Sequence, residues 1–371
     1  MKLSIERAAL LKSLGHVQSV VERRNTIPIL ANVKLTAADG RLALNATDMD
    51  IDIVETAPAT VAAKGATTAP AHTLYEIARK LPEGSEVELQ ADGEGKLTVR
   101  AGRSRFQLSC LPTEEFPVMG GGTYAHAFAL SAADLRGIIE RTRFAISNEE
   151  TRYYLNGIYL HAAKRDKTAV LRAVATDGHR LASVEVPLPK GAAGMPGVIV
   201  PRKTVAELHK LIEGGDGDVE IGVSEAKIRF AFADAELTSK LIDGTFPDYE
   251  RVIPTGNDKD LEVSRQIFTE AVDRVSAISS EKSRAVKLKL GKNALELSAT
   301  SPENGSASEE LEVAYKGPAI EIGFNARYLL DIAQQMTGDT MRLSMADAAS
   351  PTILSDAADP GGLYVLMPMR V

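Results

Sequence analysis

The chain has 371 residues, 44% of them apolar and 25% charged, which is enough apolar material for two or three globular domains. Its net charge of −7 gives no overall basic signal for nucleic acid, and its single cysteine, Cys110, excludes an intramolecular disulfide and a cysteine zinc cluster. Glu6 and Arg7 interrupt the apolar start that a signal peptide needs, and no apolar run reaches the ~18 residues of a membrane span, so we expect a soluble cytoplasmic protein with no membrane partner.

The first stretch of the chain predicts a helix, several strands and a second helix. Residues 3–17 (LSIERAALLKSLGHV) form the first predicted helix, with Ser4 as its N-cap. DMDIDIV, residues 48–54, alternates acidic and apolar side chains with the period of two that is typical of a strand. The other elements predicted here are strands at 28–35 and 103–109 and a helix at 73–81.

The middle stretch repeats this order. Residues 130–144 predict a helix capped by Ser131, with one apolar stripe at helical spacing. A strand is predicted at 153–160 (YYLNGIYL) and a second helix at 204–212 (TVAELHKLI).

The last stretch repeats it again. Residues 263–277 predict a helix capped by Ser264, residues 284–290 a strand, and residues 327–336 a second helix.

A recurring short segment supports a threefold repeat. ATDMD, ATDGH and ATSPE place Thr47, Thr176 and Thr300 at equivalent points, 129 and 124 residues apart. Turn residues in MGGGTYA after Met119, and Ile253-Pro254, mark the boundaries. We therefore predict an α+β protein of three repeated domains, 1–122, 126–252 and 253–371, each with two helices packed on antiparallel sheets.

The segment ATDGHRLA, residues 175–182, concentrates groups that are common in active sites. Asp177-Gly178 is first a turn signal, and the equivalent segments lack both His179 and Arg180, so the repeat does not require them. Three interpretations remain open: a catalytic site, a plain turn, and a binding loop on a repeat scaffold.

Other motifs for chemistry are absent from the sequence. DMDID lacks the glycine and glutamate of a calcium loop, the six histidines have no metal-ligand spacing, and no phosphate-binding loop or nucleophile elbow occurs. We expect no metal and no cofactor.

Five motifs together carry a family resemblance: RYYLNG at Arg152, TDGHRL at Thr176, FPDYERVIP at Phe246, EIGFN at Glu321 and YVLMPMRV at Tyr364. With them, the whole chain resembles the beta subunit family of bacterial DNA polymerase III, the sliding clamps. The resemblance implies the DNA clamp fold: two copies join head to tail into a ring that encircles and slides on duplex DNA, with helices lining the hole. It implies no catalysis and no cofactor, only processivity. A ring that stays on DNA because it encircles the duplex needs few phosphate contacts. This function is therefore compatible with the acidic net charge.

The resemblance also implies a groove for short motifs of roughly Q-L-x-L-F type. These would come from the DNA polymerase III alpha subunit, the delta subunit of the clamp loader, other DNA polymerases and repair proteins. Arg180 and Asn325 would pair polar groups of the peptide, whereas DAASP, residues 347–351, departs from the polar rim that the family implies. The groove residues by resemblance are Leu155, Thr176, Gly178, His179, Arg180, Leu181, Pro247, Val252, Asn325, Tyr328, Val365, Met367, Pro368, Met369 and Arg370.

Basic residues on the inner helices and loops would face DNA, with Arg24 the best candidate by resemblance. Glu149 stands where the family commonly has a DNA-facing glutamine, which puts that contact in doubt. The DNA-facing candidates are Arg24, Arg79, Lys80, Arg136, Arg141, Arg202, Lys203, Lys210 and Arg274. For each, a solvated helix face is the alternative interpretation.

The family's ring implies that the strand RSRFQLS meets the third domain of a second copy, forming a homodimer. Phe106 and Leu108 would pack on Ala277 and Ile278 of that copy; alternatively, Phe106 and Leu108 fill the core of their own domain. Arg103 and Arg105 would meet acidic side chains around Glu303 and Glu309 of that copy.

Two other functions remain as alternatives to the clamp. One is a metabolic enzyme that uses His179 and Asp177, and the other is a static protein-binding scaffold without a DNA function.

Overall fold

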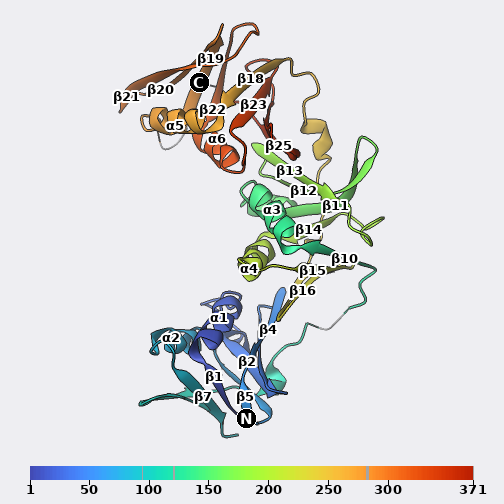
Figure 1. Cartoon of the computed structure of the whole chain (residues 1–371), viewed down its shortest axis with the longest axis vertical. Coiled ribbons are helices and arrows are strands. Elements are labelled where there is room, and N and C mark those ends of the chain that lie inside the picture. The colour runs from blue at the N-terminus through green and yellow to red at the C-terminus, as the bar shows by residue number, and fades with distance from the viewer. Residues whose placement is uncertain (94, 120–121, 281–283, 371) are drawn as a thin grey trace. The chain divides into compact units, whose positions relative to one another are not determined.

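A computed structural model describes residues 1–93, 95–119, 122–280 and 284–370 (Figure 1). The chain forms two compact units. The first contains Met1–Arg136, Pro189–Met195 and Lys203–Leu241; the second contains Gly137–Leu188, Pro196–Arg202 and Ile242–Val371. The predicted boundary segment MGGGTYA includes residues 120 and 121, which lie outside the described residues. The three domain boundaries therefore stay predictions.

The first unit contains a five-stranded and an eight-stranded sheet, and the pairings in both are antiparallel. The order in the first is β5 (Thr60–Ala63), β1 (Lys2–Glu6), β7 (Glu86–Ala91), β8 (Lys96–Ala101) and β9 (Ser104–Ser109). The order in the second is β10 (His126–Ser131), β15 (Asp218–Val223), β16 (Lys227–Phe232), β17 (Ala235–Lys240), β4 (Ile51–Pro58), β3 (Arg41–Thr47), β2 (Asn32–Ala38) and β6 (Gly65–Pro70).

The second unit contains an eight-stranded and a four-stranded antiparallel sheet. The order in the first is β14 (Val198–Pro201), β11 (Gly157–Arg165), β12 (Thr168–Thr176), β13 (Arg180–Pro187), β25 (Asp359–Leu366), β24 (Thr352–Asp356), β23 (Thr340–Met345) and β18 (Lys259–Ser264). The order in the second is β21 (Gly305–Glu312), β20 (Ala294–Ser301), β19 (Ala285–Gly291) and β22 (Ile320–Asn325).

Strands of the middle repeat enter both eight-stranded sheets, joining strands of the first repeat in one and of the third in the other. Each repeat therefore completes its sheet with a neighbour, which removes edge strands that would otherwise be open for pairing. Because the middle repeat shares a sheet with each neighbour, its residues are divided between the two compact units.

Each repeat contributes two α-helices, as predicted. The α-helices among the described residues are α1 (Arg7–Val17), α2 (Ala71–Lys80), α3 (Ala132–Arg143), α4 (Arg202–Ile212), α5 (Arg265–Ser276) and α6 (Ala326–Ala333). Figure 1 shows α1 beside α2 and α5 beside α6, and each pair is in contact. In α1 the buried residues Leu10, Leu14 and Val17 form one face, and the helix contacts α2, β3 and β4. Each such side chain contributes about 1.5–3 kcal/mol by its burial.

Two of the three predicted N-caps are confirmed. The hydroxyl of Ser131 accepts a hydrogen bond from the Asp134 N–H at 3.0 Å, and that of Ser264 accepts one from the Ile267 N–H at 3.5 Å. The prediction for Ser4 is wrong, because residues 2–6 form strand β1 between β5 and β7 and α1 begins only at Arg7. Pairing with two strands outweighs the local capping pattern there.

Two of the predicted strands begin later than expected. Their first residues form short 3-10 helices instead, η1 (Pro28–Ala31) before β2 and η3 (Glu150–Leu155) before β11. Pro28 has no N–H to donate to a sheet, which favours the start of a helical turn. The remaining short helices are η2 (Thr113–Glu115) and η4 (Tyr249–Val252).

The predicted strand at 48–54 begins only at Ile51, because its first residues form a turn. Asp48 Oδ1 accepts hydrogen bonds from the N–H groups of Asp50 and Ile51 at 2.9 and 2.7 Å. The Thr47 hydroxyl donates to the Ile51 carbonyl at 2.7 Å, and Met49 adopts a φ of 78°. The side chains of the ATD segment thus close the turn and delay the strand.

Candidate functional site

The TDGHRL turn, residues 176–181, has the same hydrogen bonds as the turn of the first repeat. The Thr176 hydroxyl donates to the Arg180 carbonyl at 2.7 Å, and Asp177 Oδ1 accepts from the N–H groups of His179 and Arg180 at 2.9 and 3.0 Å. Gly178 takes the left-handed position, with a φ of 88°, that Met49 takes in the first repeat. Thr176 and Asp177 are thus used to close the turn rather than to form a nucleophile–base pair.

An apolar cavity of about 340 Å³ opens beside this turn, entirely within the second unit. Its walls come from η3, the TDGHRL turn, η4 and the end of β25. The lining residues are Arg152, Tyr154, Leu155, Thr176, Gly178, Arg180, Leu181, Pro247, Asp248, Tyr249, Val252, Val365 and Met367. We call this cavity the groove.

The groove contains nine of the fifteen residues predicted for peptide binding. These are Leu155, Thr176, Gly178, Arg180, Leu181, Pro247, Val252, Val365 and Met367. His179, Asn325, Tyr328, Pro368, Met369 and Arg370 do not line it.

Strand pairing brings the turn and the C-terminal segment together. β13 pairs with β25, so that Arg180 lies opposite Leu366 and Leu181 opposite Val365. The Met367 N–H donates to the His179 carbonyl at 2.9 Å. Two predicted segments that are far apart in the sequence therefore form adjacent walls.

Several of the predicted residues outside the lining make other contacts within the second unit. The His179 ring stacks on the Tyr328 ring with their centroids 6.4 Å apart. The Met369 N–H donates to the Gly323 carbonyl at 2.8 Å. Asn325 is the N-cap of α6, where its Oδ1 accepts from the Arg327 N–H at 3.0 Å.

Four lining residues were not predicted: Arg152, Tyr154, Asp248 and Tyr249. All four belong to RYYLNG or FPDYERVIP, the motifs that carried the resemblance. Their place in those motifs was the available signal, but only the fold shows which of their side chains point inward.

The floor of the groove belongs to the apolar core of the second unit. Leu155, Leu181, Tyr249 and Val365 belong to one buried cluster. Two apolar side chains at the rim are exposed, Val252 at 49% and Met367 at 41%. Exposed apolar groups above a buried apolar floor are suited to accept an apolar anchor from a partner.

Arg180 is held by its own chain rather than free for a ligand. Its guanidinium donates to Asp331 at 2.6 Å, to the Phe144 carbonyl at 2.6 Å and to Asp177 at 3.1 Å. It also lies over the Phe144 and Tyr328 rings, 5.0 and 4.3 Å from their centroids. Polar groups of a peptide would have to compete with these partners. The main effect of Arg180 is therefore to tie the TDGHRL turn to α6.

Glu149 forms a bidentate ion pair with Arg152, with N–O distances of 2.6 and 2.8 Å. The hydrogen bonds from Arg152 lower the pKa of the Glu149 carboxyl. The residue that replaces the expected glutamine therefore holds a groove-lining arginine.

The departing segment DAASP forms a closed turn of its own. Asp347 Oδ1 accepts from the N–H groups of Ala349 and Ser350 at 2.8 and 2.7 Å, which lowers the pKa of the Asp347 carboxyl. None of its residues lines the groove.

Eight of the nine DNA-facing candidates lie on helices, and Arg24 lies in the segment between α1 and η1. Six of the nine are exposed: Arg24, Arg79, Lys80, Arg202, Lys210 and Arg274. The other three, Arg136, Arg141 and Lys203, are half-buried. Arg136 donates to the Ile212 carbonyl at 3.0 Å, Arg141 bonds Asp359, and Lys203 bonds Asp48 at 2.5 Å. Within the described chain, no ion pair joins Arg24 or Arg202 to another residue.

The strand predicted for subunit contact, β9, lies at the edge of its sheet, where β8 is its one partner among the described strands. Phe106 is 37% exposed and Leu108 is half-buried, so Phe106 does not fill the core of its own domain. Ala277 is exposed and Ile278 half-buried just after α5. Glu309, on edge strand β21, is already paired with Arg274 at 2.6 Å.

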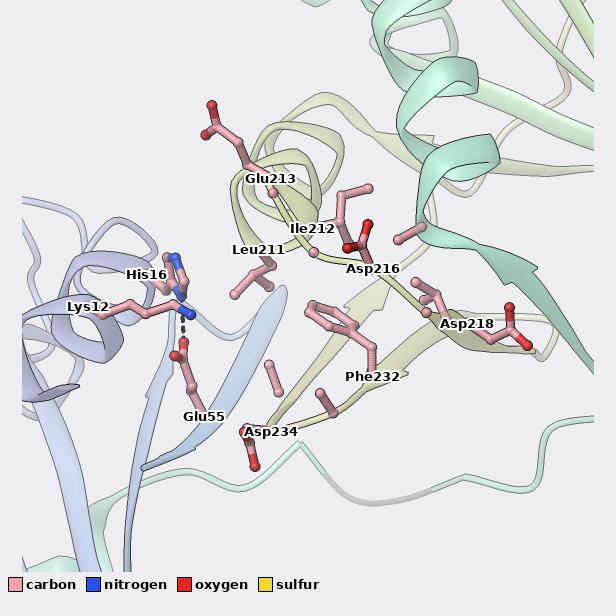
Figure 2. A pocket seen from close by; sticks show the side chains of 17 residues that line it. Lys12, His16, Glu55, Leu211, Ile212, Glu213, Asp216, Asp218, Phe232 and Asp234 are labelled. Atoms are coloured by element: carbon pink, nitrogen blue, oxygen red, sulfur yellow. Dashed lines mark hydrogen bonds and ion pairs between the residues drawn. The ribbon is translucent and has the colours of Figure 1, made fainter. Parts of the chain in front are cut away.

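A second cavity, of about 190 Å³, lies in the first unit among α1, β4, the end of α4 and the β16–β17 turn (Figure 2). His16 Nδ1 lies 2.7 Å from Glu55 Oε2, and the Ser13 hydroxyl donates to Glu55 Oε1 at 3.0 Å. Leu211 and Phe232 lie on the facing side. Every polar atom of the buried Glu55 side chain thus has a partner within the chain.

Among the described residues, no three His, Cys, Asp or Glu side chains are placed to hold a metal ion. None of the described helices combines the length and the apolar content that crossing a bilayer requires.

The three models of the DNA polymerase III beta subunit family match nearly the whole chain. The N-terminal domain matches residues 1–120, the central domain 129–248 and the C-terminal domain 250–370. A beta sliding clamp of Caulobacter vibrioides is 55% identical, and one of Escherichia coli K12 is 40% identical, each over the whole of both chains.

Solved structures agree with this match. The sliding clamp of Bartonella birtlesii bound to griselimycin has a TM-score of 0.97 at 50% identity, over the whole of both chains. A beta sliding clamp of C. crescentus has a TM-score of 0.97 at 55% identity, over 100% of this chain and 99% of that one. With three clamp domains in order and relatives matched end to end, this chain belongs to the DNA polymerase III beta subunit family, the beta sliding clamps.

Proposed function

We propose that the groove is the site through which this DNA sliding clamp tethers the replicative polymerase. The alpha subunit of DNA polymerase III, the delta subunit of the clamp loader, other polymerases and repair proteins would each dock a short apolar motif there. The protein would have no turnover of its own and would act in the cytoplasm as a processivity factor.

The observation that carries this proposal is the joining of the TDGHRL turn to Val365 and Met367 around an apolar floor. A groove with exposed Val252 and Met367 offers burial for a leucine or phenylalanine anchor, and flexible methionine adapts to different partners. The Bartonella birtlesii relative bound to griselimycin supports the view that clamps of this family carry a ligand site.

We propose further that two copies form a ring by head-to-tail contact. The exposed edge of β9, with Phe106, Leu108 and the basic Arg103 and Arg105, would meet Ala277 and Ile278 of a second copy. An exposed phenylalanine on a strand at the edge of its sheet supports an interface there.

DNA would pass through the ring along the helices. The exposed candidates, led by Arg24 and Arg202, would make a small number of phosphate contacts. The net charge of −7 fits retention by topology, since tight phosphate binding would oppose sliding.

A labelled peptide of Q-L-x-L-F type tests the groove by fluorescence anisotropy. Val252→Asp places a charge at the apolar rim and is expected to weaken binding by about tenfold or more, equivalent to about 1.4 kcal/mol. Val118→Asp is the matched control, because Val118 is also an exposed valine but belongs to the first unit. Equal affinity of both variants would remove the groove from the proposal.

A further inference from the structure

We propose that a buried polar relay, Arg172–Tyr249–His161, positions one wall of the groove and thereby sets its affinity for peptides. This inference rests on the groove being the docking site. The wall in question is the segment 247–252, which includes η4 and contributes Pro247, Asp248, Tyr249 and Val252 to the lining.

The wall lies outside both sheets of the second unit, so side chains must hold it. The guanidinium of Arg172, on β12, holds the wall at two successive residues. Its Nη1 donates to the Tyr249 hydroxyl at 2.8 Å and to Glu250 Oε1 at 2.7 Å. Arg172 Nε donates to Glu185 Oε1, on β13, at 2.7 Å. The arginine thus joins the wall to two strands of the sheet behind it.

Tyr249 connects this arginine to the groove. Its side chain is only 6% exposed and its ring is part of the groove floor, near the rings of Tyr159 and Phe246. Its hydroxyl lies 3.0 Å from His161 Nε2, on β11. Any shift of this hydroxyl therefore moves a surface that a bound peptide would touch.

The donors and acceptors of the three side chains give the relay one direction in which each hydroxyl and ring proton has an acceptor. Arg172 only donates, so the Tyr249 hydroxyl accepts from it, and its own proton is used when it donates to its other partner, His161 Nε2. His161 then carries its proton on Nδ1, which lies 3.2 Å from the Ala162 carbonyl. Only neutral His161 can complete this chain.

The surroundings favour the neutral form of His161. Burial is the largest cause and lowers the pKa of His161, and the nearby Arg172 charge lowers it too, against opposing contributions from the hydrogen bond with the Ala162 carbonyl and from Glu250 and Glu185. The Tyr159 ring stacks on His161 at 4.6 Å between centroids. Protonation would turn Nε2 into a donor and break the bond from Tyr249.

The first repeat lacks the ion pair of the relay. Shifting by the 129 residues that separate Thr176 from Thr47, the cross-strand pair Arg172–Glu185 corresponds to Ala43–Thr56. The clamp scaffold therefore folds without this ion pair, which points to a role in the groove rather than in the fold.

Tyr249→Phe tests the relay, with Tyr315→Phe as its matched control. Tyr315 is also buried, and its hydroxyl donates to the Pro318 carbonyl at 2.7 Å, away from the groove. The probe is an end-blocked Q-L-x-L-F peptide without an ionisable side chain. We expect Tyr249→Phe to weaken binding roughly fivefold to tenfold while Tyr315→Phe binds like the parent, although each loses the hydroxyl of a buried tyrosine together with its hydrogen bonding.

The pH dependence separates positioning from general stability. Because the pKa of His161 is lowered, the parent should keep a constant affinity near neutral pH and lose affinity only below the ordinary histidine range, as His161 gains its proton. His161→Gln keeps an acceptor for Tyr249 but takes no proton, so it should bind like the parent at neutral pH and keep that affinity in acid.

The outcomes distinguish the two proposals. If the parent does not bind the peptide, the groove itself is not the docking site. If the parent binds and Tyr249→Phe matches Tyr315→Phe, the relay does not position the wall. If His161→Gln keeps the acid loss of affinity, another group causes that loss and His161 has no part in the relay.

Discussion

Lys203 and Arg24, both predicted to face DNA, have opposite surroundings. Lys203 donates to Asp48 Oδ2 at 2.5 Å and to Glu22 and the Val20 carbonyl at 3.2 Å each. Burial alone would lower the pKa of Lys203, but the hydrogen bonds and charges of Asp48 and Glu22 raise it. This ammonium therefore holds the first ATD turn to α4, whereas Arg24 is exposed without an ion pair to any described residue.

We expect Lys203→Ala to lower the free energy of unfolding by about 1–2 kcal/mol, because it leaves the nearly buried Asp48 carboxylate without its cation. Arg24→Ala should leave unfolding unchanged and weaken DNA association at low salt, reducing the salt dependence by about one phosphate contact. Urea denaturation and DNA binding over a salt series measure the two effects. If Lys203→Ala weakened DNA association without lowering the free energy of unfolding, Lys203 would contact DNA rather than hold the turn.

At the scale of elements, the edge strand β9 and the turn after α5 carry the proposed subunit contact. Changing Phe106 and Ile278 to Asp is expected to give folded monomers, since an unpaired charge in an interface costs several kcal/mol. Ile267→Asp is the control, because Ile267 is an exposed isoleucine on α5 itself. Sedimentation velocity, with circular dichroism to confirm folding, decides: a dimer in the Asp variant would place the subunit contact elsewhere.

For the whole molecule, a ring predicts retention by topology rather than by affinity. After loading on a nicked circular duplex, the acidic protein should stay bound at salt concentrations that disrupt its ionic contacts with phosphates. Linearising the circle should release it. Gel filtration of the loaded DNA before and after cleavage measures both steps, and equal retention on linear DNA would contradict encirclement.

Local sequence determined much of the architecture. The threefold order of helices, the caps at Ser131 and Ser264 and the turn at Asp177-Gly178 rest on contacts within a few residues, so their patterns are readable along the chain. The motifs also named most of the groove residues and the family.

Long-range pairing decided the rest. Ser4 lies in a strand because residues distant in sequence pair on both sides of it, a partnership that its own neighbourhood does not encode. Arg180 and Lys203 look like free basic groups in the sequence, yet carboxylates from other elements hold them. Arg172, Tyr249 and His161 are far apart along the chain, and only the tertiary structure brings them together behind the groove, because a hydrogen bond depends on position in space and not on spacing in sequence.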